Sequence, residues 1–386
     1  MYPYLVTYII STIFAYIASI IDSKPVKFIF CVLSIAPVVL LAALRDMTIG
    51  GDTSDYPWFL YNVSYYMQYI EMLSQYSDSY DFLFVLGTAY VTKTFRNFNV
   101  VLGSYQLFMS AIFICYMYKE HPRSIWIGMM TYNAFVFQTS LTIIRQLLAY
   151  SVLLVSFFLA KHKKPILFLV TIGIAFCFHR TGILGIIIYP LFMLFRMKTF
   201  SKEDKKFKLY LTFIIILGAG CVFLVTFILK DELIRFLALT KESYKYQVSR
   251  LNRGKLTNSS IFMLAFNIGT FYIFANKNFS NVKGKNYLNP SLFVAFSLTI
   301  VYFFLSLFSL AADSLQRIAM GFLIFYPIFY TLLADNAKTD KHRAVFIFLL
   351  IAFTIFYTIF MLTNATSYQC VPYKSQVIDE LLGIHL

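Results

Sequence analysis

Apolar segments separated by short polar loops follow one another along the whole sequence. A transmembrane helix needs about 20 apolar residues. The segments that reach or approach this length predict an all-α polytopic membrane protein with about 12–13 transmembrane helices, at residues 4–21, 26–44, 82–95, 98–118, 124–138, 141–160, 166–178, 181–195, 209–229, 260–276, 291–311, 318–334 and 344–363. None of the loops is typical of a soluble domain. We therefore expect a single integral membrane domain over residues 1–386, with two long loops at 45–80 and 230–259.

Basic residues in the short loops predict how these helices are oriented. Loops 161–165, 196–208 and 277–290 are each rich in Lys or Arg. Short loops with such an excess remain in the cytoplasm. The opposite, outer side then holds loop 230–259, the C-terminal tail, Arg145, His179 and Arg317.

One apolar segment must fail to cross the bilayer if this alternation is to hold. Loop 45–80 is acidic and belongs on the outer side, yet counting back from residue 141 places it inside. We expect segment 82–95 to be a re-entrant or interfacial helix, because it is short and contains Lys93. Segment 124–138 is the alternative.

Composition supports a membrane protein and excludes several other classes. The chain is 59% hydrophobic and only 13% charged, whereas soluble domains are about 25% charged. The net charge of +15 comes mainly from loops between apolar segments, which indicates contact with the lipid bilayer and no nucleic-acid partner. The five cysteines show neither a disulfide framework nor metal-ligand spacing.

Charged residues within or beside the apolar segments are the strongest functional signal. Arg145 and Arg317 each open an apolar run, and His179-Arg180 interrupts the stretch 166–195. An ionisable group at membrane depth costs about 3 kcal/mol, so it usually faces a cavity and has a function. The interrupted stretch predicts two short helices meeting at a turn that lines a polar, cationic chamber.

A glycine-containing turn after the second apolar segment offers further polar groups. Gly50 and Gly51 allow a tight turn that would present Asp52 and backbone N–H groups to phosphate oxygens. Arg45 can add a fork-shaped clamp, and Asp52 can act as a general base. The alternative is an ordinary helix-ending turn with a snorkelling arginine.

Arg145 and His179 are the other candidates for catalysis. Arginine suits a diphosphate better than lysine does, and Gln146 beside Arg145 favours a cavity over a snorkelling side chain. His179 titrates near neutral pH and can take a proton from a hydroxyl group. Arg180 would lower the pKa of His179 and favour its neutral form. The alternative is a histidine that only holds two short helices together.

Three further features have both a functional and a structural explanation. Arg317 can bind an anion or pair with Asp313 four residues earlier. The basic loop 230–259 can bind an anionic ligand or lie in solvent at the lipid surface. An aromatic series can form a platform for sugar rings or an interfacial helix, and it consists of Trp58, Tyr61, Tyr65 and Tyr69 on one expected helical face.

Together these motifs resemble the EpsG family of bacterial surface-polysaccharide proteins, which is grouped with the Wzy-type O-antigen and capsule polymerases. The resemblance covers nearly the whole chain. It rests on Arg45, Gly51-Asp52-Thr53, Tyr56, Ile144-Arg145-Gln146, Ala149, Phe178-His179, Arg317 and Val371-Pro372-Tyr373.

The resemblance implies a glycosyltransferase of the membrane glycosyltransferase C type in the bacterial inner membrane, with its site toward the periplasmic face. Such a polymerase moves a glycan chain from undecaprenyl diphosphate onto the non-reducing end of a lipid-linked repeat unit. It uses no nucleotide sugar, metal or other cofactor, which agrees with the lack of a D-x-D motif. A flippase and a chain-length regulator are the implied protein partners.

The candidate catalytic residues are His179, Asp52 and Arg145, with either His179 or Asp52 as the base. The candidate substrate-binding residues are Arg45, Tyr56, Gln146, Arg180, Arg250, Arg253 and Arg317.

A flippase or transporter of lipid-linked oligosaccharides is the alternative function. It would also contain many apolar helices and a cationic cavity. The candidate charges lie toward one side of the expected topology, whereas a flippase needs access from both sides. The sequence also lacks the two related halves that many transporters show.

Overall fold

The computed structural model describes residues 2–196, 258–270, 280–282, 285–287, 289–308, 313–337, 339–363, 370–375 and 377–378. The predicted segment 209–229 and most of loop 230–259 lie outside this described part. Within it the chain is helical, apart from a short antiparallel hairpin of β1 (Ser280–Val282) and β2 (Lys285–Tyr287).

The first half of the chain forms helices in close succession. They are α1 (Tyr2–Ile20), α2 (Lys24–Ala43), η1 (Ser54–Trp58), α3 (Phe59–Tyr66), α4 (Tyr69–Tyr80), α5 (Phe82–Phe95), α6 (Phe98–Glu120), α7 (Ile125–Tyr132), η2 (Asn133–Phe137), α8 (Gln138–Thr142), α9 (Ile144–Lys161), α10 (Pro165–Phe178), η3 (Arg180–Ile187) and α11 (Ile188–Arg196). The predicted segments before residue 196 agree closely with these bounds. Two of them consist of several pieces: 124–138 extends to Thr142 as α7, η2 and α8, and 181–195 consists of η3 and α11.

The described helices of the second half are fewer. They are α15 (Asn258–Thr270), α16 (Pro290–Phe308), α17 (Asp313–Gly321), η8 (Phe322–Ile324), α18 (Phe325–Asp335) and α19 (Asp340–Thr363).

The apolar helices confirm an all-α polytopic membrane protein. Six helical stretches of the described residues are long and apolar enough to cross a bilayer: α1, α2, α6, α9, Gln316–Asp335 and α19. Shorter apolar helices are Phe82–Phe95, Pro165–Phe178 and Pro290–Ser306. α9 and the stretch Gln316–Asp335 are mostly buried, whereas most residues of α1, α2 and α19 are not buried. An exposed apolar helix side suits contact with lipid.

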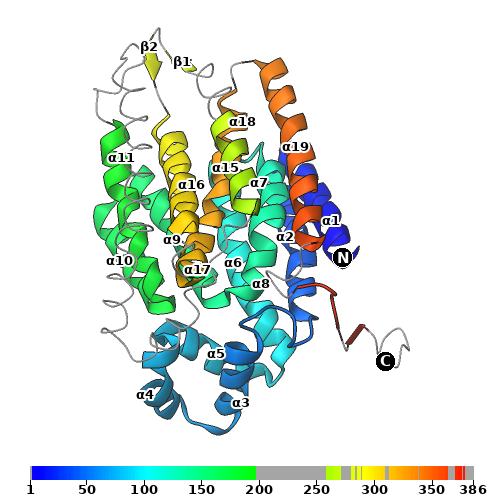
Figure 1. Cartoon of the computed structure of the whole chain (residues 1–386), viewed down its shortest axis with the longest axis vertical. Helices are drawn as coiled ribbons and strands as arrows, with labels where there is room; N and C mark the ends of the chain where they lie inside the picture. The colour runs from blue at the N-terminus through cyan, green and yellow to red at the C-terminus, as the bar shows by residue number, and fades with distance from the viewer. Residues whose placement is uncertain are drawn as a thin grey trace.

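The bundle has two different ends (Figure 1). α3, α4 and α5 are grouped at one end, and the β1–β2 hairpin lies at the other. The C-terminal end of α5 is attached to α3 by two hydrogen bonds. Lys93 Nζ donates to Met67 O at 2.6 Å, and Tyr61 Oη donates to Arg96 O at 3.1 Å. α7 and α8 instead lie along the bundle. That segment 82–95 does not cross the bilayer stays a prediction.

Small residues allow the buried helices to approach one another closely. Gly321 at the end of α17 faces Tyr150 of α9, and a Cβ there would lie 2.7 Å from the ring carbons. Gly182 lies against the backbone of Ala175 in the same way, at 2.6 Å. These contacts bring α17 against α9 and η3 against α10. They thereby position Arg317 on α17 and Arg180 on η3.

Candidate functional site

The turn between α2 and η1 is fixed by its contact with α8. Gly50 has a φ of 84°, and a Cβ on this residue would lie 2.0 Å from Leu141 O. Thr53 Oγ1 donates to Ile49 O at 2.8 Å. Only glycine fits this backbone position, so the turn holds Asp52 in one place relative to the bundle.

Asp52 pairs with Arg317, which lies 265 positions later in the chain. Arg317 Nη1 donates to Asp52 Oδ1 at 3.1 Å, and the Asp52 side chain is 9% exposed. Burial raises the pKa of Asp52 above its ordinary value, and the positive charges of Arg317 and Arg145 partly oppose this rise. Gln146 Nε2 donates to Ile318 O at 3.2 Å and thereby ties α9 to the helix that carries Arg317.

Arg145 lies at the start of α9 within a group of aromatic rings. Its guanidinium carbon is 4.0 Å from the centre of the Tyr56 ring, with the rings of Tyr80 and Phe84 at 5.8 and 6.0 Å. Arginine stacks favourably on such faces. Its Nη1 atom also lies 3.4 Å from Asp81 Oδ2. The aromatic rings therefore orient the guanidinium group of Arg145.

Asp81 was not among the candidates and is the main residue that the sequence missed. Its carboxylate lies between two arginines, with Oδ2 3.4 Å from Arg145 Nη1 and Oδ1 3.9 Å from Arg180 Nε. Arg180 Nη2 also donates to Asp78 O at 2.8 Å. The only signal in the sequence is an acidic residue directly before an apolar segment, which is too common a pattern to indicate a site.

His179 joins α10 to η3 and caps the start of η3. Its Nδ1 atom accepts a hydrogen bond from the Thr181 N–H at 3.2 Å and lies 2.7 Å from Thr181 Oγ1. Burial, followed by the charges of Arg145 and Arg180, lowers the pKa of His179 to about 4. The imidazole is therefore neutral near pH 7. Because Nδ1 accepts a hydrogen bond, the proton lies on Nε2, and His179 offers a donor to a ligand.

Arg45 lies behind the Asp52 turn and away from the other arginines. Its side chain is buried, its Nη2 atom is 3.4 Å from Thr53 Oγ1, and it forms no ion pair with the described residues. Burial lowers the pKa of Arg45 to about 10. Residues 370–375 cover this region, since Tyr373 Oη donates to Leu41 O at 2.9 Å. The structure thus places Arg45 under the turn that holds Asp52.

The structure therefore brings most of the candidate residues to one end of the bundle, from segments far apart in sequence. Asp52, Tyr56, Arg145, His179, Arg180 and Arg317 lie in one polar network with Asp81. Arg250, Arg253 and the Asp313 side chain lie outside the described part. The same part shows no group of three His, Cys, Asp or Glu side chains that could hold a metal ion.

The EpsG family model matches residues 28–375. The chain belongs to the EpsG family. This family is of the Wzy-type, polysaccharide-polymerase-like kind, as the sequence motifs predicted. No curated protein and no solved structure matches the chain.

The aromatic series of this EpsG-family protein differs from the expected single helical face. Trp58, Tyr61 and Tyr65 do share one side, with ring centres 5.8 and 6.4 Å apart. The helix ends at Tyr66, so Tyr69 belongs to α4 and the predicted continuity is wrong. The ring nearest to Arg145 is instead Tyr56, which packs against Tyr80 at 5.6 Å.

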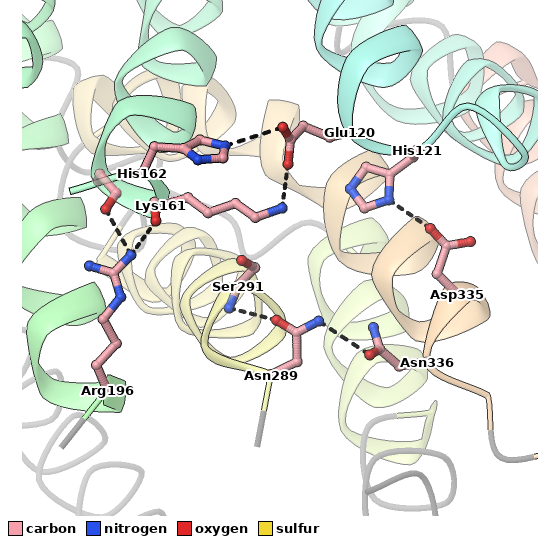
Figure 2. Close-up of polar contacts among 10 residues, drawn as sticks. Glu120, His121, Lys161, His162, Arg196, Asn289, Ser291, Asp335 and Asn336 are labelled. Carbon is pink, nitrogen blue, oxygen red and sulfur yellow. Dashed lines mark hydrogen bonds and ion pairs between the residues drawn. The ribbon is translucent and has the colours of Figure 1, made fainter. Parts of the chain in front are cut away.

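A second polar network lies at the β1–β2 end and ties helix ends together (Figure 2). His121 Nδ1 lies 2.6 Å from Asp335 Oδ2, and Glu120 accepts hydrogen bonds from Lys161 and His162. Arg196 donates to the last carbonyl groups of α9. Basic side chains suit the negative ends of helix dipoles, so these contacts account for the ends of α6, α9 and α18 meeting here.

Proposed function

We propose that this protein is a metal-independent membrane glycosyltransferase that polymerises a bacterial surface polysaccharide. It would transfer a glycan chain from undecaprenyl diphosphate to the non-reducing end of a lipid-linked repeat unit. The observation that carries this proposal is the network in which Arg145, Arg180 and Arg317 surround the carboxylates of Asp52 and Asp81. The three guanidinium groups supply N–H donors for the oxygens of an anionic ligand.

The guanidinium groups suit the main energetic demand of this reaction. When the bond between the anomeric carbon and the diphosphate breaks, negative charge develops on the leaving oxygen. Preorganised donors aimed at developing charge usually supply the largest share of catalysis. The paired N–H groups of an arginine guanidinium match the spacing of two phosphate oxygens. Arg145 and Arg180 therefore hold the diphosphate in this proposal, and the N–H at Nε2 of His179 donates to one of its oxygens.

Asp52 is the better candidate for the base. The attacking hydroxyl oxygen forms a bond to the anomeric carbon, the bond to the diphosphate oxygen breaks, and the hydroxyl proton passes to Asp52. Burial raises the pKa of this carboxylate, which strengthens it as a proton acceptor. His179 is less suited, because Nδ1 already accepts from Thr181 and Nε2 carries the proton. Arg317 would orient the carboxylate of Asp52.

Charge distribution supports placing this site at the outer face of the inner membrane. The helix ends at the β1–β2 end carry many basic side chains among the described residues, including Lys24, Lys27, Lys163, Lys164 and Arg343. Such segments remain in the cytoplasm. The α3–α5 end then faces the periplasm, where lipid-linked repeat units are joined. A fold of the membrane glycosyltransferase C type remains a prediction.

Reconstitution of the purified protein tests this function. The protein is placed in liposomes with synthetic undecaprenyl-diphosphate repeat units, without nucleotide sugar or added metal, and the products are separated on a gel. We expect a ladder of chain lengths that Asp52→Asn and Arg145→Ala abolish. Asp55→Asn, an exposed carboxylate on the neighbouring turn, and Arg123→Ala, at the opposite end, are the matched controls and should retain the ladder.

Absence of a ladder with the cognate repeat unit would contradict the proposal. Movement of the same lipid between leaflets, measured in the same liposomes, would then establish the alternative function of a flippase.

A further inference from the structure

Arg45 carries a positive charge that no acidic side chain balances among the described residues. The residue is 4% exposed, its Nη2 atom lies 3.4 Å from Thr53 Oγ1, and its buried Nε atom has no hydrogen-bond acceptor there. The contact with Thr53 is long, and Thr53 Oγ1 directs its own proton to Ile49 O. A buried charge without a partner is strongly destabilising, so this guanidinium group requires a further compensating group.

The titratable groups around Arg45 are uncharged near neutral pH. The side chains that affect it most strongly are those of Cys370, Tyr4, Tyr373 and Tyr105. A thiol and three phenols keep their protons at pH 7, and burial raises the pKa of Cys370 to about 11. The negative end of the α2 dipole compensates for part of the charge, but it gives the Nε–H group of Arg45 no acceptor.

A second buried donor without an acceptor belongs to the adjoining helix α8. The Nε2 atom of Gln138 is buried and has no hydrogen-bond partner among the described residues. Gln138 lies beside Cys370, whose Sγ atom is 3.8 Å from the Gln138 carbonyl oxygen. α8 also reaches the surroundings of Arg45 through Leu141 O, which lies 3.5 Å from Thr53 Oγ1. Both unpaired groups are N–H donors, so both require an acceptor.

Charge and burial together select a small monovalent anion as that acceptor. A water molecule can accept from both groups but leaves the charge of Arg45 uncompensated. A diphosphate carries more negative charge than one guanidinium group balances. Residues 370–375 also close this region against a large ligand, since the N–H of Asp46 donates to Lys374 O at 2.9 Å. A halide ion has one negative charge and no donor of its own, and so meets both demands.

We propose that Arg45 and Gln138 bind one chloride ion beneath the turn that holds Asp52. The ion accepts hydrogen bonds from Arg45 Nε and Gln138 Nε2 and neutralises the guanidinium group. It thereby stabilises the contact between this turn, α8 and the C-terminal segment 370–375. The chloride site is separate from Arg145 and Arg180, and the inference does not depend on the proposed function.

Thermal unfolding of the purified full-length protein in detergent tests for this site. The midpoint temperature is measured at pH 7 while potassium chloride replaces potassium gluconate, whose anion is large, at constant ionic strength. An ion that binds only the folded protein raises the midpoint as its concentration rises. We expect a rise of about 2–4 °C in chloride, with a half-point that marks binding, and bromide should replace chloride.

Three variants assign the rise to the proposed site. Arg45→Met removes the charge and should abolish the rise; in gluconate it should unfold at no lower temperature than the unaltered protein, because an uncompensated buried charge is gone. Gln138→Leu removes one donor to the ion and should need at least about tenfold more chloride to reach the half-point. Arg123→Met makes the same change of charge as Arg45→Met at an exposed position. It is the matched control and should keep the rise.

The results distinguish a bound ion from a water molecule. Equal midpoints in chloride and gluconate for the unaltered protein would overturn the proposal, because Arg45 would then bind no chloride. The same rise in Arg45→Met would place the ion elsewhere and would also overturn it. If Arg45→Met does not fold, Gln138→Leu decides, since an unchanged half-point excludes Gln138 as a ligand and refutes the two-residue site. The gel ladder tests the proposed function independently of all these results.

Discussion

His179 can be tested as a donor rather than a base, because its hydrogen bonds fix where its proton lies. The Nδ1 atom accepts from the Thr181 N–H at 3.2 Å, and burial with two nearby arginines lowers the pKa of the side chain to about 4. Glutamine can place an amide N–H close to the position of Nε2 but cannot serve as a base. His179→Gln should therefore retain most of the polymerisation rate, and His179→Ala should not.

The size of the effect follows from the interaction that is lost. A hydrogen bond to a charged group contributes about 1.5–3 kcal/mol, so His179→Ala should slow the reaction by about 10- to 150-fold. His179→Gln should remain within about tenfold of the unaltered protein, because it keeps one donor at the site. Loss of a general base would cost about 10²- to 10⁴-fold in both variants.

The assay is the initial rate of ladder formation in liposomes, measured at equal protein content and saturating lipid-linked repeat unit. Thr181→Val is the control variant, because it removes the Oγ1 contact with Nδ1 but keeps the N–H that fixes the proton on Nε2. Its rate should change by less than about tenfold. Equal loss of activity in His179→Gln and His179→Ala would refute the assignment and make His179 the base.

Other predictions concern the base, the Asp52 turn and the C-terminal segment. Burial raises the pKa of Asp52 above its ordinary value of 3.8, so the rate should fall as pH falls through a pKa above that value; a rate–pH profile without this acid limb would exclude Asp52 as the base. Gly50→Ala should destabilise the protein by more than about 1–2 kcal/mol through its left-handed φ, and the added clash with α8 should abolish polymerisation. Gly87→Ala, where a Cβ meets nothing within 4 Å, is its control, and unchanged thermal unfolding of both variants would contradict the account. Tyr373→Phe should lose about 1 kcal/mol of stability with its hydrogen bond to Leu41 O, and an unaltered unfolding temperature would show that the bond contributes nothing.

The helices could be predicted closely from the sequence because hydrophobic length is a local property. Segment 82–95 coincides with α5, and 166–178 differs from α10 by one residue at its start. The short interrupted stretch at His179 also forms two helices with a turn, as expected. That 82–95 does not cross the bilayer follows from the rule for basic loops and stays a prediction.

The pairing of the charged side chains could not be predicted in the same way. The structure pairs Arg317 with Asp52, a contact that the sequence did not indicate. The Asp313 side chain, which the sequence offered as a partner of Arg317, lies outside the described part. Asp81 showed no local feature that indicated a site, and only the packing of α5 against the ends of α9 and α10 places it beside two arginines. Arg45 lies in the expected motif, yet the turn directs it away from the network.

The sequence by itself thus determined a polytopic helical membrane protein, most of its helix bounds, its family and the residue types that its loops carry. Each of these follows from hydropathy or short motifs, which act over a few turns of helix. Only the tertiary structure decided which charges meet, because those contacts join residues as far apart as Asp52 and Arg317, 265 positions along the chain. Such pairings depend on how helices pack around close contacts such as Gly321 on Tyr150, and packing is a property of the whole bundle.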